Sequence, residues 1–312
     1  MLARLQQFST LSLFAMAAAW AAWFLHVGKP VWAMAGAALI VFGYALFLAI
    51  EFVLVWFVHG SDPAPRASAS QLFRAWIGEV VTAPRVFCWQ QPFRAQLEPD
   101  FLPHAAGRRG VVLVHGFVCN RGLWNRWLPH LRAQGVPFVA VNLEPVFGTI
   151  SDYAAIIETA VQRVEQSTGM APVLVGHSMG GLAIRAWLAA FKSGERVHRV
   201  ITIGSPHRGT WLGRFGMSRN AREMALGTDW QRALEAREST QHFERFTCFY
   251  SHCDNIVFPA STATLPGAHN RHVLGSAHVQ MLDQPEVLSD VLAWVRPASP
   301  AADTAAEAVL AR

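Results

Sequence analysis

The sequence lacks the blocks of basic residues with which nucleic-acid-binding proteins contact phosphate groups. Its 26 lysine and arginine residues are scattered over 312 positions, and no motif interleaves basic with aromatic residues. The formal net charge of +5 therefore does not predict a nucleic-acid partner. Arginines scattered in this way suit an anionic lipid surface better.

Cysteine is also scarce, and its spacing excludes the common metal-binding patterns. The four cysteines are Cys88, Cys119, Cys248 and Cys253, and no pair has the C-x-x-C spacing. We expect buried thiols, although an oxidising compartment would allow a bridge between Cys248 and Cys253. Neither a metal nor another cofactor is predicted.

Long apolar runs, in contrast, occupy the N-terminal part of the chain. The run from Leu11 to Val27 is almost free of ionisable residues, and the run from Val31 to Val58 is apolar apart from Glu51. Each is long enough to cross a hydrocarbon layer, which needs about 20 residues. Residues 1–59 are therefore predicted to form a transmembrane helical hairpin, with its turn at Gly28-Lys29-Pro30.

Two features of this hairpin leave alternatives open. The first run also resembles a secretory signal peptide, but the second run would still anchor the mature chain. Arg4, Arg66 and Arg74 outside the runs outnumber Lys29 in the turn, which favours a cytoplasmic catalytic domain. A long domain can cross a membrane regardless of flanking charge, so the periplasmic side stays possible.

Glu51 is costly in lipid unless it faces a partner helix, lies near an end or is protonated, and we assign it no role.

Three further segments are predicted after the hairpin. Residues 60–109 combine a linker rich in Pro, Ala and Ser with an amphipathic helix at 71–81. That helix either lies on the membrane surface or caps the domain that follows. Residues 110–296 are predicted to be the catalytic domain, and the alanine-rich residues 297–312 a flexible tail.

Strand and helix patterns alternate along the catalytic domain. This order predicts an α/β fold with a mostly parallel sheet covered on both faces. Strands are expected at 111–114, 137–141, 173–175, 197–203, 246–250 and 271–274. Helices are expected at 123–133, at 152–166 with Ser151 as N-cap and Gly169 near the exit, and at 285–295.

The segment Gly176-His177-Ser178-Met179-Gly180 joins a buried-strand pattern to a helix-compatible one. A nucleophile elbow requires this context, because the serine hydroxyl must project from the sheet edge while the glycines leave room for the helix. Ser178 is therefore the candidate nucleophile. The pentapeptide alone is weak evidence, because many such sequences are only turns.

A serine hydroxyl needs a base to take its proton and an acid to orient that base, and in this architecture the chain order is Ser, acid, His. Asp254 and His278 each follow a predicted strand, at the sheet edge where open α/β folds assemble their sites. We predict Asp254 as the acid and His278 as the base. The competing acids are Asp229, Asp283 and Asp290, and the competing bases are His269 and His272.

The oxyanion hole needs two backbone N–H donors. The residue after the nucleophile, Met179, supplies one of them. The other comes from the loop after an early strand, where His115-Gly116-Phe117 makes Phe117 the natural donor. His115 precedes the serine in the chain and is expected to order this loop by hydrogen bonding.

Five blocks in this order resemble the bacterial triacylglycerol lipases of the α/β-hydrolase superfamily. The blocks are Val111 to Phe117, Gly176 to Gly181, Thr202 to Thr210, Asp254 to Pro259, and Gly275 to His278. The resemblance implies an α/β-hydrolase fold with Ser178, Asp254 and His278 as triad and Phe117 with Met179 as oxyanion donors. It also implies a region covering the site, for which residues 211–237 are the candidate beside a plain surface insertion. Some relatives bind calcium, but no clustered carboxylates are evident here, so none is predicted.

These observations predict a membrane-anchored serine hydrolase acting on lipophilic carboxylic esters, with acylglycerols as the leading class. The same triad would also serve a phospholipase, a thioesterase or an acyltransferase, because the fold does not determine the acyl acceptor. A non-catalytic membrane scaffold that retains a hydrolase shell is the alternative from another class. The oligomeric state is not predicted.

Overall fold

The computed structural model describes residues 1–103, 107–238 and 240–295, so the predicted tail at 297–312 lies outside the described residues. Six strands form one sheet in the order β2-β1-β3-β4-β5-β6, and every neighbouring pair is parallel. The strands are β1 (Val111–Val114), β2 (Phe138–Ala140), β3 (Val173–His177), β4 (Arg199–Ile203), β5 (Phe246–Tyr250) and β6 (His269–His272). The predicted parallel α/β sheet is confirmed.

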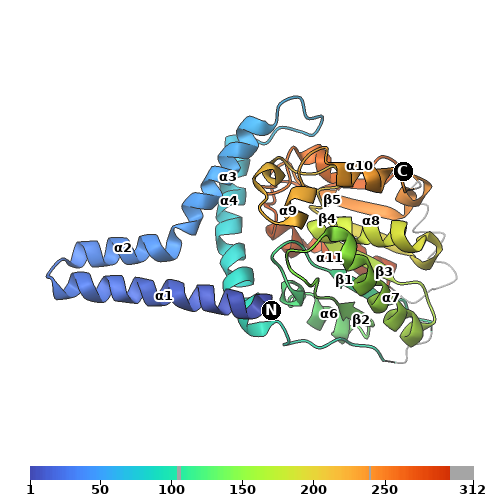
Figure 1. Ribbon diagram of the computed structural model, residues 1–312, viewed down its shortest axis with the longest axis horizontal. Helices are drawn as coiled ribbons and strands as arrows, with labels where there is room; N and C mark the ends of the chain where they lie inside the picture. The colour runs from blue at the N-terminus through green and yellow to red at the C-terminus, as the bar shows by residue number, and fades with distance from the viewer. Residues whose placement is uncertain (104–106, 239, 296–312) are drawn as a thin grey trace.

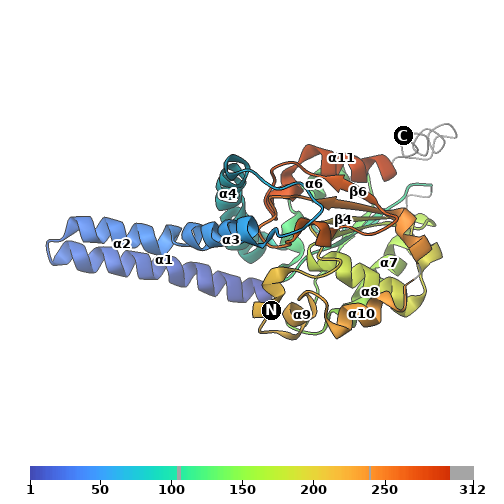
Figure 2. The same cartoon turned by 90° about the horizontal axis from the view of Figure 1, so that it is seen from above.

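Helices cover both faces of this sheet (Figures 1 and 2). One apolar core packs the sheet against α7 (Ala154–Thr168) and α8 (Met179–Phe191). The other packs it against α6 (Leu128–Ala133) and α11 (Pro285–Trp294). Strands β1 to β4 are buried along their whole length, as expected when both faces of a parallel sheet are covered.

Shorter elements connect these layers. The short α-helices are α5 (Gln91–Arg94), α9 (Arg219–Glu223) and α10 (Asp229–Glu235), and η1 (Arg85–Gln90) is a π-helix. The 3-10 helices are η2 (Arg121–Trp124), η3 (Ile150–Tyr153), η4 (Gly194–Arg196), η5 (Trp211–Phe215), η6 (Thr240–Arg245), η7 (Ala260–Ala263) and η8 (Gln280–Asp283).

Several predicted boundaries are wrong. The helix expected at 123–133 is divided into η2 and α6, because Pro129 belongs in the first turn of a helix and α6 therefore begins at Leu128. Ser151 is not an N-cap, because η3 precedes α7 and Glu223, from a distant segment, accepts the N–H of Ile150 at 2.8 Å. The last strand begins at 269 rather than 271, in register with 247–250.

The N-terminal helices α1 (Leu2–His26) and α2 (Pro30–Phe42) lie side by side and project away from the sheet (Figures 1 and 2). Helix α1 is long and apolar enough to cross a membrane. Helix α2 is about 20 Å long at 1.5 Å per residue, which is shorter than a hydrocarbon layer of about 30 Å. It passes the same test only together with α3 (Tyr44–Val58), from which it is bent by 50°.

The second predicted span is therefore not one straight helix. The bend lies at Gly43, where a Cβ atom would come within 2.5 Å of the carbonyl oxygen of Leu39. Glycine, which is also a weak helix former, fits this close approach. The bend turns α3 back toward the sheet domain.

Helix α4 (Ala69–Pro84) caps the domain, as one of the two interpretations of the amphipathic segment predicted. A third apolar cluster joins α3 and α4 to the loops that follow β5 and β6. Its members include Phe52, Val55, Leu72, Ala75, Cys253, Phe258 and Ala277. Packing of this cluster places the N-terminal helices against the carboxyl edge of the sheet.

Ala75 is fully buried in this cluster, so we expect that Ala75→Leu overpacks it and destabilises the protein by about 1–3 kcal/mol. Ala69→Leu is the matched control, because Ala69 is exposed on the same helix and surface changes cost about 0.5 kcal/mol or less. Thermal unfolding of both variants in detergent measures the difference. Equal melting temperatures for the two variants would contradict this packing.

Candidate active site

Ser178 lies at a sharp turn between β3 and α8. Its φ of +55° and ψ of −127° place a non-glycine residue in a strained conformation that costs about 1–3 kcal/mol. The adjacent glycines make the turn possible, because a Cβ at Gly176 would lie 2.7 Å from the backbone nitrogen of Gly181. A Cβ at Gly180 would lie 2.3 Å from the carbonyl oxygen of Val114. The strand, turn and helix predicted around this serine are all present.

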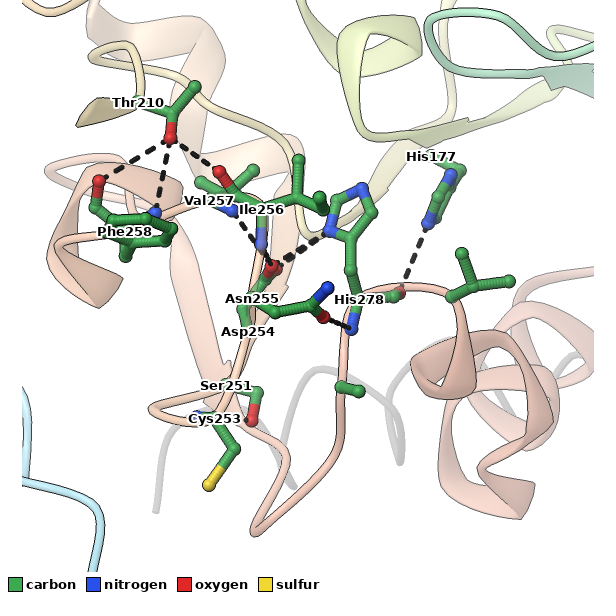
Figure 3. A network of polar contacts seen from close by, with 12 residues as sticks. His177, Thr210, Ser251, Cys253, Asp254, Asn255, Ile256, Val257, Phe258 and His278 are labelled. Carbon is green, nitrogen blue, oxygen red and sulfur yellow. Dashed lines mark hydrogen bonds and ion pairs between the residues drawn. The ribbon is translucent and has the colours of Figure 1, made fainter. Parts of the chain in front are cut away.

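Asp254 and His278 face each other from the loops after β5 and β6 (Figure 3). The Nδ1 atom of His278 lies 2.9 and 3.0 Å from the two carboxylate oxygens of Asp254, and both side chains are buried. The Oδ1 atom of Asp254 also accepts the N–H groups of Ile256 and Val257, each at 2.8 Å. The carboxylate is thereby held in place, and the other ring nitrogen of His278, Nε2, is left for a different partner.

Two carboxylates of the N-terminal helices hold the same loops. Glu51 of α3 accepts a hydrogen bond at 2.6 Å from the side-chain amide of Asn255, whose Oδ1 accepts the N–H of His278 at 3.2 Å. Glu79 of α4 accepts the N–H groups of Val279 and Gln280 at 3.1 and 3.2 Å. These N-terminal carboxylates position the loop that carries His278.

Sequence reasoning missed this arrangement, because it assigned no role to Glu51 and took Glu79 only as a polar residue of the amphipathic helix. Each carboxylate contacts a residue about 200 positions away, and no local pattern predicts such a contact. One available signal was the isolated acid in an otherwise apolar run. A buried carboxylate needs hydrogen-bond partners, and here backbone and amide N–H groups provide them.

The charges around His278 favour its protonated form. Burial alone would lower the pKa of this ring, but the nearby carboxylates of Asp254, Glu79 and Glu51 raise it above the ordinary value. Burial raises the pKa of Glu79 to about 7, against the opposing effects of His278 and the two backbone N–H groups. His177, whose ring centre is 4.7 Å from that of His278, has its pKa lowered well below the usual value by burial and by His278.

A cavity of about 620 Å³ joins Ser178 and His278 to the N-terminal helices. Its inner end contains Gly116, Phe117, His177, Ser178, Asn255 and His278. Helices α1 to α4 supply much of the remaining lining. Among the described residues that line the cavity, none belongs to 211–237. The segment 211–237, considered either as a cover or as a plain surface insertion, therefore does not line the cavity: Trp211 stacks on Phe258, beside the Asp254 loop, with ring centres 6.0 Å apart.

The two backbone groups predicted for an oxyanion lie next to the serine. Met179 is the first residue of α8, and a helix leaves the N–H groups of its first turn without carbonyl partners. Phe117 lines the same cavity beside Gly116, where a Cβ would lie 2.8 Å from that of Ser178. His115 orders this loop as expected: its Nε2 accepts the N–H of Leu143 at 3.0 Å, and its Nδ1 lies 2.9 Å from the carbonyl oxygen of Gly116.

The competing residues lie elsewhere and have other partners. Asp229, Asp283 and Asp290 form ion pairs with Arg232, Arg126 and Arg271 respectively. His269 and His272 belong to β6, and His272 contacts His252. All four cysteines are free, so the bridge considered between Cys248 and Cys253 is absent.

Comparison with known proteins identifies the family and the fold. A model of the alpha/beta hydrolase family matches residues 111–306. A pimeloyl-[acyl-carrier protein] methyl ester esterase from Photobacterium profundum is 33% identical over 132 residues, which cover 40% of this chain and 50% of that protein. The chain thus matches about half the length of this curated relative.

Two solved structures share the fold at low sequence identity. The mature form of Bacillus licheniformis lipase BlEst2 has a TM-score of 0.51 at 18% identity, covering 59% of this chain and 90% of that one. Aspergillus fumigatus lipase B has a TM-score of 0.52 at 18% identity, covering 64% and 56% of the two chains. At these identities the likeness establishes the fold alone.

The charges around His278 predict its titration. We expect the pKa of its ring to lie above the ordinary histidine value, and we expect Asp254→Asn to lower that pKa, because the variant removes the nearest carboxylate charge that opposes the effect of burial. Glu79→Gln should lower the pKa by less, and Asp290→Asn is the control because Asp290 pairs with Arg271 instead. NMR of ¹⁵N-histidine-labelled protein measures these values. A His278 pKa that does not respond to Asp254→Asn would contradict the assigned pair.

Proposed function

The chain belongs to the alpha/beta hydrolase family, and we propose that it is a membrane-anchored serine hydrolase that cleaves carboxylic esters of lipids. One observation carries this proposal. His278, which is hydrogen-bonded to Asp254, lines a largely apolar cavity together with a serine held at a strained strand-to-helix turn. A nucleophile, a base and an acid that orients the base are the elements that acyl transfer requires.

In the proposed acylation step, the Oγ atom of Ser178 attacks the ester carbonyl carbon while Nε2 of His278 takes the hydroxyl proton. Asp254 accepts the Nδ1–H of the ring, which selects the correct tautomer and stabilises the imidazolium. The tetrahedral intermediate then collapses, and the C–O bond to the alcohol breaks. His278 gives its proton to the departing alcohol, so the ring is neutral again and Ser178 carries the acyl group.

The negative oxygen of the intermediate would be bound by the N–H groups of Met179 and Phe117. Each such donor is worth a factor of about 100 to 1,000 in turnover, because it is already oriented toward the developing charge. In the second half of the reaction, His278 takes a proton from water, and the hydroxide attacks the acyl-enzyme. The carboxylic acid leaves, and the proton returns to Ser178.

The N-terminal helices support the membrane anchor. Helix α1 has the length and composition of a membrane-crossing helix, and the paired helices α1 and α2 project from the sheet domain (Figure 1). Large apolar side chains are exposed along both helices, including Phe8, Leu11, Trp23, Val31, Trp32 and Leu39. An exposed apolar surface of this extent is typical of contact with membrane or protein rather than water.

Replacement of the nucleophile tests the proposal. Purified Ser178→Ala should lose turnover of p-nitrophenyl esters by about a thousandfold or more, because removal of the serine removes the covalent route. Ser193→Ala is the matched control: this serine is also buried but lies outside the cavity, and its Oγ has no hydrogen-bond partner among the described residues. Its activity should stay near that of the wild type.

Labelling by a fluorophosphonate separates an enzyme from a non-catalytic scaffold. Wild type should be labelled at Ser178, with the adduct located by peptide mass spectrometry, and Ser178→Ala should not be labelled. Folded wild-type protein that neither reacts with the probe nor cleaves any ester would refute the proposed activity.

A further inference from the structure

The N-terminal helices do more than border the sheet domain, because they form part of the wall of the cavity that contains Ser178. Helix α1 contributes Leu13 and Phe14, and the end of α2 contributes Ile40, Val41 and Phe42. After the bend at Gly43, Phe47 and Leu48 of α3 continue the same lining. A segment that served only as a tether would not need side chains at this cavity.

The polarity of the lining changes from one end of the cavity to the other. Ser178, His278, Asn255, Glu51 and Glu79 are grouped where the loops after β5 and β6 meet α3 and α4. The part supplied by α1 and the α2–α3 bend is apolar. This distribution matches an amphiphilic ester whose carbonyl group lies at Ser178 and whose hydrocarbon chain lies between the helices.

The outer part of the cavity is bordered by exposed aromatic side chains. Phe14, Phe42 and Phe47 all line the cavity, yet they expose 53, 62 and 64% of their surface. A cluster of exposed aromatic side chains is unfavourable in water and favourable in hydrocarbon. It lies on the same helices whose length and composition suit a membrane. The apolar part of the cavity therefore adjoins helix surfaces that are suited to contact with lipid.

We propose that α1 and the bent pair α2–α3, together with α4, form the acyl-chain site of this protein, and that its occupant is the unbranched acyl chain of a membrane lipid ester. This inference rests on the proposed ester hydrolysis at Ser178. The volume of about 620 Å³ is within the range of about 300–1,000 Å³ typical of small-molecule sites. In this arrangement the anchor selects the substrate, because residues of α1 and α2 limit the chain length.

The test compares p-nitrophenyl acetate, butyrate, octanoate and palmitate in mixed micelles. For the wild type, kcat/KM should rise by up to about fourfold per methylene until the site is full. Leu13→Trp fills the site from α1, and Ile40→Trp fills it from α2. Each should lower the ratio of palmitate to butyrate turnover by about tenfold or more, equivalent to losing contact with about two methylenes. Butyrate, whose chain is too short to fill the site, is the reference substrate for each variant.

Matched controls come from the same helices. Leu11 and Leu39 are 58 and 60% exposed and do not line the cavity, so Leu11→Trp and Leu39→Trp introduce the same side chain outside the site. Both should keep the wild-type chain-length profile. Labelling rates of Ser178 with short-chain and long-chain alkyl fluorophosphonates give a second measure that does not depend on turnover.

The outcomes distinguish this inference from the proposed function. An unchanged palmitate-to-butyrate ratio in both Leu13→Trp and Ile40→Trp, with butyrate turnover intact, overturns the acyl-chain site and leaves the hydrolase. A wild-type protein that cleaves none of the esters overturns the hydrolase itself. If one of the two cavity variants does not fold, the other cavity variant and the control on its helix provide the test.

Discussion

Two buried carboxylates connect the N-terminal helices to the loops that carry Asp254 and His278, and the rest of the candidate site depends on this connection. Glu51 binds Asn255, which in turn binds the backbone of His278, and Glu79 binds the two N–H groups that follow that histidine. Without these acceptors, each buried N–H group would be left unpaired at a cost of about 1–3 kcal/mol. The position of His278 is therefore set jointly by the sheet and by helices outside it.

The same contacts explain why the apolar helices meet the sheet domain at its carboxyl edge. Parallel sheets gather their functional loops at that edge, and here the loops after β5 and β6 present both apolar and polar groups to α3 and α4. Phe52, Leu72 and Ala75 belong to the apolar cluster formed by the same two helices that carry Glu51 and Glu79. In the proposed enzyme, the anchor, the wall of the cavity and the support of the catalytic base are one structural unit.

Local patterns predicted the parts of the site that depend on local geometry. The elbow at Ser178 needs a strand, a small-residue turn and a helix within a few residues, and all three are visible in the sequence. Asp254 and His278 followed from their order and from their place after strands. The division of the 123–133 helix was also readable in principle, because Pro129 allows a helix to begin nearby but not to continue through it.

Contacts between distant segments could not be predicted in this way. The role of Glu51 depends on a partner 204 positions away. The bend at Gly43 matters because it directs α3 toward the sheet domain, which lies far away in the sequence. The cavity is lined by the N-terminal helices and not by the candidate cover at 211–237, and chain order alone does not show which segment reaches the cavity. The cytoplasmic side of the membrane, inferred from a few arginines, stays a prediction.

The most direct test of the central claim is an experimental structure of the full chain with Ser178 bound to a long-chain alkyl phosphonate. The account predicts that the alkyl chain lies between α1 and the α2–α3 bend, in contact with Leu13 and Ile40. It also predicts that Glu51 and Glu79 keep their bonds to the catalytic loops. An alkyl chain that instead runs beneath residues 211–237, with no contact to α1 or α2, would contradict it.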